Sequence, residues 1–476
     1  MAAFTSLFPS VTRLPRAVAA GFVALECLFL ALFFIGLAAN RFLLVVAALA
    51  VPVHLFLLVW FFNSNFRLVA FFSALFPFAT LALLPYEYAE LGLYLGVLGL
   101  VVCLMAVDGA FSRSGHYRRA GRSTVVALLV IVLAAMLASV LAWARGWGFR
   151  VTHLISLLLV LLAVWVYAVV PDSIAQLRVL VYVLIAAFAA ACLTLPYFLQ
   201  HAGGFATRKT FDTLFGRPNL NLVGMIAAAG VSILLGAVHD SRQRGLPWHL
   251  LGMAVLLPVL LFSKSRGAWL GFGVALIYVA VRMRSIKLVV IMAVLAAALL
   301  TQDVFRFSLA VRAEQTGTQD PSLLGRFVIW RTAWDVFRSN WLFGVGVENF
   351  RHVKFSFGFP RIMDPANWHG THNMFLEQFV SLGVAGGVAF LLLPLSAFLR
   401  LDCLLRRHCA SPRGLMVGLN AGLLAFGVHC MFDSPGWNRA SFVFWGVLLG
   451  LVVAAGRLAL SGQECQRSET AEIGSG

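Results

Sequence analysis

Residues 124–144 read TVVALLVIVLAAMLASVLAWA, a run of 21 residues without a charged side chain. About 20 apolar residues in an α-helix cross the hydrocarbon core of a bilayer. Comparable runs recur along almost the whole chain, so the sequence predicts an all-α polytopic membrane protein of about 12–14 transmembrane helices. The expected spans lie near residues 17–39, 42–62, 68–85, 91–107, 124–144, 151–170, 179–198, 219–238, 247–263, 267–281, 288–301, 374–399, 414–432 and 441–460.

The composition of the chain excludes the main classes of soluble protein. Of the 476 residues, 61% are hydrophobic and only 12% are charged, and the mean hydropathy is +0.92. A soluble domain averages about a quarter charged residues, so this chain lacks the charges to cover a water-facing surface. A disordered chain, a disulfide scaffold and a nucleic-acid-binding domain are excluded on the same grounds. The net charge of +17 indicates basic loops on one side of a membrane together with an anionic ligand.

The basic segments predict how the chain is oriented. Lysine and arginine concentrate in the cytoplasmic loops of membrane proteins. When the expected spans are counted, the densest basic segments all fall on one side, and they are residues 13–16, 113–122, 242–244, 282–287 and 400–413. Both termini then lie in the cytoplasm, and the long loop 302–373 lies outside. We divide the chain into N-terminal transmembrane helices (1–200), a core that includes this loop (201–460) and a disordered cytoplasmic tail (461–476).

The external loop contains an amphipathic pattern of its own. In residues 325–338, GRFVIWRTAWDVFR, four aromatic side chains recur at spacings of three and four, while Arg331, Asp335 and Arg338 occupy the other side. This spacing predicts an amphipathic helix that lies on the bilayer or caps the bundle. We expect Asn340 and the turn at 344–346 to end it.

Two arginines outside the basic segments indicate an anion site. Arg217 precedes the helix expected from residue 219, and Arg266 precedes the helix expected from residue 267. Both helices enter from the external face, where the free N–H groups and dipole of a helix N-terminus attract anions. The planar fork of arginine suits a phosphate or pyrophosphate, with Lys264 as a weaker candidate. For either arginine alone, the alternative is contact with lipid phosphates.

His372 precedes a third helix on the same face, the one expected from residue 374. Because imidazole titrates near neutral pH, His372 can act as a general base, and His369 competes for this role. The alternative for His372 is a structural role as a helix cap or an interfacial side chain. Glu377, an acid within the membrane, can orient an imidazole or hold a substrate hydroxyl. Asp433 lies at an external helix end and equally suits a plain turn.

Several familiar motifs do not occur in the sequence. It contains no Walker loop, no His-Glu-x-x-His and no dinucleotide fingerprint, so ATP, zinc and NAD have no support. None of the seven cysteines has a Cys-x-x-Cys spacing. We therefore expect no metal and no other cofactor.

Four short motifs resemble one known family. His372-Asn373, followed after nine residues by Gly383-x-x-Gly386, resembles the histidine motif of bacterial O-antigen ligases. The other motifs resemble the core of the O-antigen ligase/polymerase superfamily, and they are Ser265-Arg266-Gly267, the Gly-Arg-x-x-x-Trp run at 325–330 and Gly344-Val-Gly346. The resemblance covers roughly residues 205–440.

The resemblance implies a multi-spanning glycosyltransferase of the bacterial inner membrane with a periplasmic active site. It implies transfer of O-antigen glycan from undecaprenyl pyrophosphate to lipid A–core oligosaccharide, with contacts to membrane lipids and none to nucleic acid. Carried over by motif, Arg217 and Arg266 grip the pyrophosphate and His372 assists the acceptor hydroxyl. Further expected substrate-binding residues are Lys264, Asn373, Glu377 and His369. Because the lipid pyrophosphate is an activated leaving group, the transfer needs no metal, and direct displacement inverts the anomer.

Two alternatives remain at this stage. A polymerase of O-antigen or capsule would use the same donor with a second lipid-linked glycan as acceptor. A transporter of the lipid-linked glycan is less compatible with the sequence, since transporters often show inverted repeats with broken helices in both halves. Here the unusual polar residues gather in one half and on one face.

Overall fold

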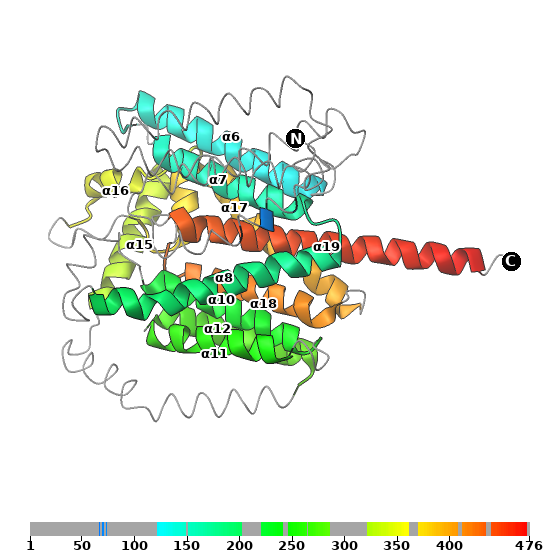
Figure 1. Ribbon diagram of the computed structural model, residues 1–476. Coiled ribbons are helices and arrows are strands. Elements are labelled where there is room, and N and C mark those ends of the chain that lie inside the picture. The colour runs from blue at the N-terminus through cyan, green and yellow to red at the C-terminus, as the bar shows by residue number, and fades with distance from the viewer. Residues whose placement is uncertain are drawn as a thin grey trace, which may run out of the picture.

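The computed structural model describes residues 121–148, 151–201, 220–240, 246–263, 265–285, 321–360, 370–407, 412–434 and 439–473, with four positions between 66 and 73. These residues form helices and turns and contain no β-strand (Figure 1). The predicted all-α membrane fold is confirmed.

Nine of the expected spans correspond to helices in the described part of the chain. They are α6 (Arg122–Ala144), α7 (Val151–Val169), α8 (Ile174–His201), α10 (Leu220–Val238), α11 (Leu246–Phe262), α12 (Arg266–Met283), α17 (Met374–Arg406), α18 (Arg413–Cys430) and α19 (Arg439–Ile473). Among the described residues, seven helices are long and apolar enough to cross a membrane, while α7 and α11 are shorter. The expected spans at 17–39, 42–62, 91–107 and 288–301 lie outside the described residues, as does most of 68–85.

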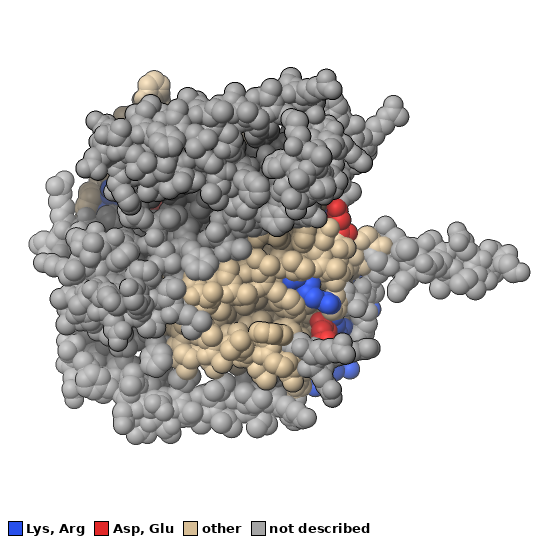
Figure 2. Space-filling model, in the orientation of Figure 1, with Lys and Arg blue, Asp and Glu red and all other residues tan. Residues whose placement is uncertain are grey.

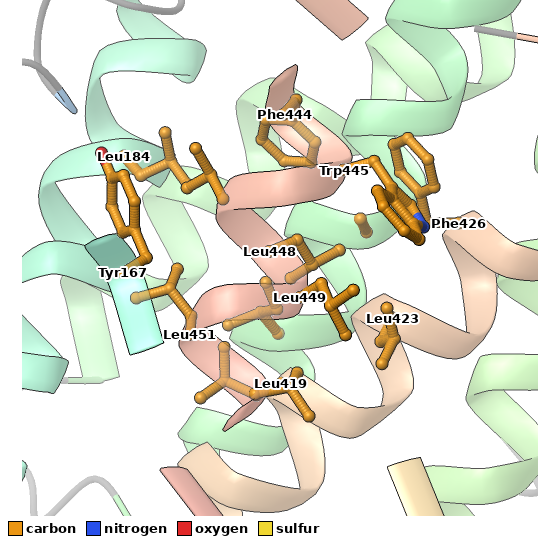
Figure 3. Close-up of a cluster of buried hydrophobic side chains, with 14 of the residues drawn as sticks. Tyr167, Leu184, Leu419, Leu423, Phe426, Phe444, Trp445, Leu448, Leu449 and Leu451 are labelled. Atoms are coloured by element: carbon orange, nitrogen blue, oxygen red, sulfur yellow. The ribbon is translucent and has the colours of Figure 1, made fainter. Parts of the chain in front are cut away.

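Three helices form the interior of the described bundle. In the apolar segments of α10, α18 and α19, 78 to 83% of the residues are buried, whereas the figure for α6 and α12 is 33%. Glycines bring α10 and α18 into close contact, because a Cβ on Gly236 would lie 2.5 Å from the Cα of Gly418. Figure 3 shows side chains of α19, including Trp445 and Leu448, between α18 and the side chains of Tyr167 and Leu184.

The last helix, α19, extends beyond the expected span at 441–460. The helix continues to Ile473 and projects from the bundle (Figure 1). The run from Gln463 to Ile473 contains neither glycine nor proline, and Gly474 follows it. Nothing in that run therefore breaks a helix, and glycine is the usual residue just beyond a helix end.

Charged residues gather at one end of the bundle, where α12 and α17 end and α18 begins. The carboxylate of Asp402 accepts hydrogen bonds from Arg282 at 2.7 Å, Arg406 at 3.0 Å and Tyr278 at 2.9 Å. Asp240 accepts hydrogen bonds from the first backbone N–H groups of α18. In Figure 2 the conspicuous charged side chains lie toward the end from which α19 projects, beside a broad uncharged band. The basic segments that these helices carry thus share one end of the molecule, as predicted.

The amphipathic helix of the loop is confirmed as α15 (Pro321–Ser339). Its buried face differs from the expected aromatic face: Ile329, Ala333 and Val336 are fully buried, whereas Phe327 and Trp334 are more than half exposed. The sequence does not show which side of the helix is buried, because the helix is apolar on two adjacent faces. In the structure, the compact aliphatic side chains fill the small core below the helix. The predicted end of the helix at Asn340 is confirmed.

Candidate active site

The end of the bundle opposite the charged cluster brings together several helix ends. The N-termini of α10, α12 and α17 lie there with the C-terminus of α18, and α15 packs against α17. The alternating direction of the helices produces this arrangement, so residues more than 200 positions apart in the sequence are neighbours. Three helix N-termini at one end supply free N–H groups and positive dipole ends suited to an anion.

Hydrogen bonds to the backbone N–H and to the carbonyl of Thr371 hold the loop before α17 in place. Glu377 accepts a hydrogen bond from the backbone N–H of Thr371 at 2.6 Å, and the indole of Trp330 on α15 donates to the Thr371 carbonyl at 2.9 Å. The side-chain oxygen of Asn373 caps α17 by accepting from Phe375 N at 3.1 Å and Leu376 N at 3.0 Å. The cap is therefore Asn373, and the alternative role of His372 as the cap is not seen.

His372 adopts a left-handed backbone conformation, with a φ of 52°. This conformation costs a residue with a side chain roughly 1–2 kcal/mol, which the two hydrogen bonds at Thr371 offset. The imidazole approaches the C-terminal end of α18, where its Nδ1 lies 3.4 Å from Oδ1 of Asp433. This distance is long for a hydrogen bond, as it often is at catalytic sites without substrate. The strained loop thus directs the imidazole toward a carboxylate.

Asp433 is the centre of a polar cluster. Asn221, at the start of α10, donates to Oδ2 at 3.3 Å, Ser434 N donates to Oδ1 at 2.8 Å, and Nε2 of the buried His429 lies 4.0 Å from Oδ2. Burial raises the pKa of the Asp433 carboxyl, but its interactions with His372 and His429 and the hydrogen bond from Ser434 N outweigh this effect, so the pKa is lowered. Asp433 is consequently a carboxylate at neutral pH, and it favours the imidazole tautomer with the proton on Nδ1.

Arginines flank this cluster on two sides. Arg266 is the first residue of α12, and Ser265 caps the helix by accepting from Ala268 N at 3.3 Å. A Cβ on the next residue, Gly267, would lie 3.0 Å from Nδ1 of His429, so the start of α12 contacts the cluster directly. Arg326 on α15 lies within electrostatic range of His429. Positive charge, two imidazoles and a carboxylate therefore lie together.

The structure brings together four of the predicted site residues, His372, Asn373, Glu377 and Arg266, at this end of the bundle. Arg217, Lys264 and His369 lie outside the described residues. Sequence reasoning missed His429, Arg326 and Asn221. The sequence could have indicated two of them. His429 lies one helical turn before Asp433, and Arg326 belongs to the Gly-Arg-x-x-x-Trp motif.

One segment of the chain matches a known protein family. Residues 251–391 match the family model described as O-Antigen ligase. The predicted resemblance to the O-antigen ligase family is confirmed. No curated protein matches the chain. The matched segment contains Arg266, Arg326, His372 and Glu377, whereas Asp433 and the other side chains around it lie outside the match.

The glycines of the O-antigen ligase motifs hold two backbones in contact. Val345 N donates to Val380 O at 2.9 Å, Gly346 N to Ser381 O at 3.0 Å, and Val384 N to Trp341 O at 2.7 Å. These bonds form where α17 is interrupted at Gly383, which has a φ of 70° and a ψ of −172°. A Cβ on Gly383 would lie 2.3 Å from Leu342 O. The motif glycines thus fix the turn after α15 against the helix that follows His372.

We expect Gly383→Ala to destabilise the protein by about 2–5 kcal/mol, because the alanine would have to adopt a positive φ and its methyl group would overlap a backbone oxygen. Gly427→Ala is the matched control: Gly427 lies within α18, and its Cβ would meet nothing within 4 Å. This control should be neutral or slightly stabilising. Thermal unfolding in detergent measures both variants, and equal melting temperatures would contradict the packing role of Gly383.

Proposed function

We propose that this protein transfers O-antigen glycan from undecaprenyl pyrophosphate to lipid A–core oligosaccharide at the periplasmic face of the inner membrane. The family match supports an activity of the O-antigen ligase or polymerase type. The observation that carries the proposal is the pairing of His372 with Asp433 where the N-termini of α10, α12 and α17 meet. A base beside an anion site is what transfer from a pyrophosphate donor requires.

In the proposed reaction His372 acts as the general base. Its Nδ1 faces Asp433, so Nε2 accepts the proton of the acceptor hydroxyl. The hydroxyl oxygen forms a bond to the anomeric carbon as the bond to the pyrophosphate oxygen breaks, and the pyrophosphate leaves with the bonding electrons. Asp433 stabilises the imidazolium that results, as the carboxylate does in a catalytic triad. Attack opposite the leaving group inverts the anomeric configuration.

The departing pyrophosphate gains negative charge as the bond breaks. In the proposal, Arg266 and Arg217 bind it through paired hydrogen bonds, and the N-termini of α10, α12 and α17 add backbone N–H groups. The three helix N-termini stand in place before reaction, so little reorganisation of these groups opposes transfer. A polyprenyl pyrophosphate is already activated, and no nucleotide is consumed.

Purified protein given the lipid-linked glycan and lipid A–core is expected to form glycosylated lipid A–core, visible as a mass increase of the acceptor. The rate should not change when EDTA is added, because arginines and helix N-termini carry the charge stabilisation. A product formed only from two lipid-linked glycans would identify a polymerase instead. Strict dependence on a divalent ion would contradict the proposed chemistry.

The orientation in the membrane can be tested with one cysteine at each end of the bundle. Ser339→Cys lies at the exposed end of α15, and the native Cys403 is exposed near the charged end of α17. With all other cysteines replaced, an impermeant maleimide added to spheroplasts should label residue 339, and Cys403 only after permeabilisation. The reverse labelling pattern would place the candidate active site in the cytoplasm.

A further inference from the structure

A polar pocket lies directly behind the loop that carries His372. It is formed by the start of α7, the turn after α15, the first turns of α17 and the start of α19. Its empty space measures about 350 Å³, part of which is open to the surroundings. This space is small, so the pocket suits a single ring rather than a long chain.

Two side chains in the pocket wall have unused hydrogen-bonding groups. Gln378 is 93% buried and Ser381 is 98% buried, and both line the pocket. Within the described part of the chain, the structure gives neither the Gln378 amide nor the Ser381 hydroxyl a hydrogen-bond partner. A buried amide without a partner destabilises a fold, so such groups are normally satisfied by water or by a ligand.

The remaining lining residues define the chemistry of that ligand. Glu348 and Glu377 contribute carboxylates that accept hydrogen bonds, while the amide of Gln378 can both donate and accept. Phe442 of α19 adds an apolar ring surface. Hydroxyl groups on an apolar ring, as in a sugar, match this combination. A pyrophosphate matches it less well, because the lining contains two acidic side chains against one imidazole, that of His153.

The position of the pocket relates it to the acceptor. Glu377 lines the pocket, and its Oε2 also holds Thr371 N, one residue before His372. The arginines lie at the starts of α12 and α15, elements that do not contribute to the pocket. The His372 loop therefore has an anion-binding neighbourhood at the ends of α10, α12 and α18, and a hydroxyl-binding pocket against α7 and α19.

We infer that this pocket binds the sugar residue that carries the accepting hydroxyl. The inference rests on the proposed function, which supplies the need for a sugar acceptor beside His372. Gln378 and Ser381 bind hydroxyl groups of that sugar, and Glu377 couples its presence to the position of the His372 loop. The pyrophosphate-linked donor reaches His372 from the arginine side.

The test uses Gln378→Leu, which keeps a similar volume and removes the hydrogen-bonding groups. With saturating lipid-linked glycan and varied lipid A–core, the KM for the acceptor should rise roughly three- to tenfold while the KM for the donor is unchanged. The melting temperature should stay the same or rise, because a buried amide has been replaced by an apolar group. Ser381→Ala should shift the acceptor KM in the same direction.

Gln176→Leu is the matched control, because this glutamine lies in the first turn of α8 near the charged end and is already bonded to Asp172 N. It should leave both KM values unchanged. A rise in the donor KM, or no change in either constant for Gln378→Leu, would overturn the inference.

A binding measurement separates this inference from the proposed function. Purified core oligosaccharide, freed of lipid, is titrated against the wild type and Gln378→Leu. If the wild type forms no glycosylated lipid A–core but binds core oligosaccharide more tightly than the variant, the proposed function fails and the pocket stands. Equal binding by both proteins overturns the pocket, whatever the wild type transfers.

Discussion

His372→Asn is expected to lower the rate of glycan transfer by about a hundred- to ten-thousandfold, the usual effect of removing a well-placed acid–base group. Asparagine cannot accept a proton at neutral pH. It does tolerate the left-handed conformation that residue 372 adopts, with a φ of 52°, so the loop should keep its shape. Turnover with both lipid substrates measures the loss. His372→Ala should be equally inactive but somewhat less stable, because alanine is strained at this φ.

The alternative roles of His372 give different results. A structural role would leave His372→Asn close to wild type, and the structure already assigns the cap of α17 to Asn373. A phosphate-binding role of the imidazolium would abolish binding of the lipid pyrophosphate donor together with turnover. We expect donor affinity to be retained, since the arginines remain. His352→Asn, at an exposed histidine of α16 (Phe350–Val353), is the control and should keep nearly full activity.

Local sequence signals were sufficient for most of the helices. Apolar runs of about 20 residues predicted each described span, and the aromatic and charged spacing at 325–338 predicted α15. The helix starts at Arg266 and Met374 agree with the expected positions to within one residue. Such features depend on neighbours within one or two turns of the chain, which the sequence displays directly.

The partners of His372 could not be predicted in this way. Asp433 meets an asparagine 212 positions earlier in the chain, and no local period reports such a contact. The sequence offered a carboxylate at a helix end, for which a turn residue was an equally good interpretation. Its role follows only from the packing of α10 against α18, which brings Asn221 to it. The pocket behind the loop has the same origin, since four separate elements form its wall.

Arg266→Ala is expected to lower the rate of transfer by about a hundred- to a thousandfold, the range seen when one stabiliser of a developing anion is removed. Arg266 is exposed at the first position of α12, and the cap of that helix is Ser265. The substitution should therefore leave membrane insertion and the melting temperature unchanged. The measurement is turnover at saturating substrates, together with donor affinity, since a group that binds pyrophosphate contributes to both.

Arg266→Lys tests whether the site needs the guanidinium group of arginine or only a positive charge at this position. Lysine keeps the charge but offers a single ammonium in place of the planar fork, so it should recover only a small part of the lost rate. Arg331→Ala on α15 is the control, because this exposed arginine lies five residues beyond Arg326 and thus on a different face of the helix. It should retain nearly full activity. Full activity in Arg266→Lys would show that the site needs only positive charge near the helix N-termini. Comparable losses in Arg331→Ala and Arg266→Ala would mean that no particular arginine holds the pyrophosphate. Either positive charge would then contribute equally to transfer.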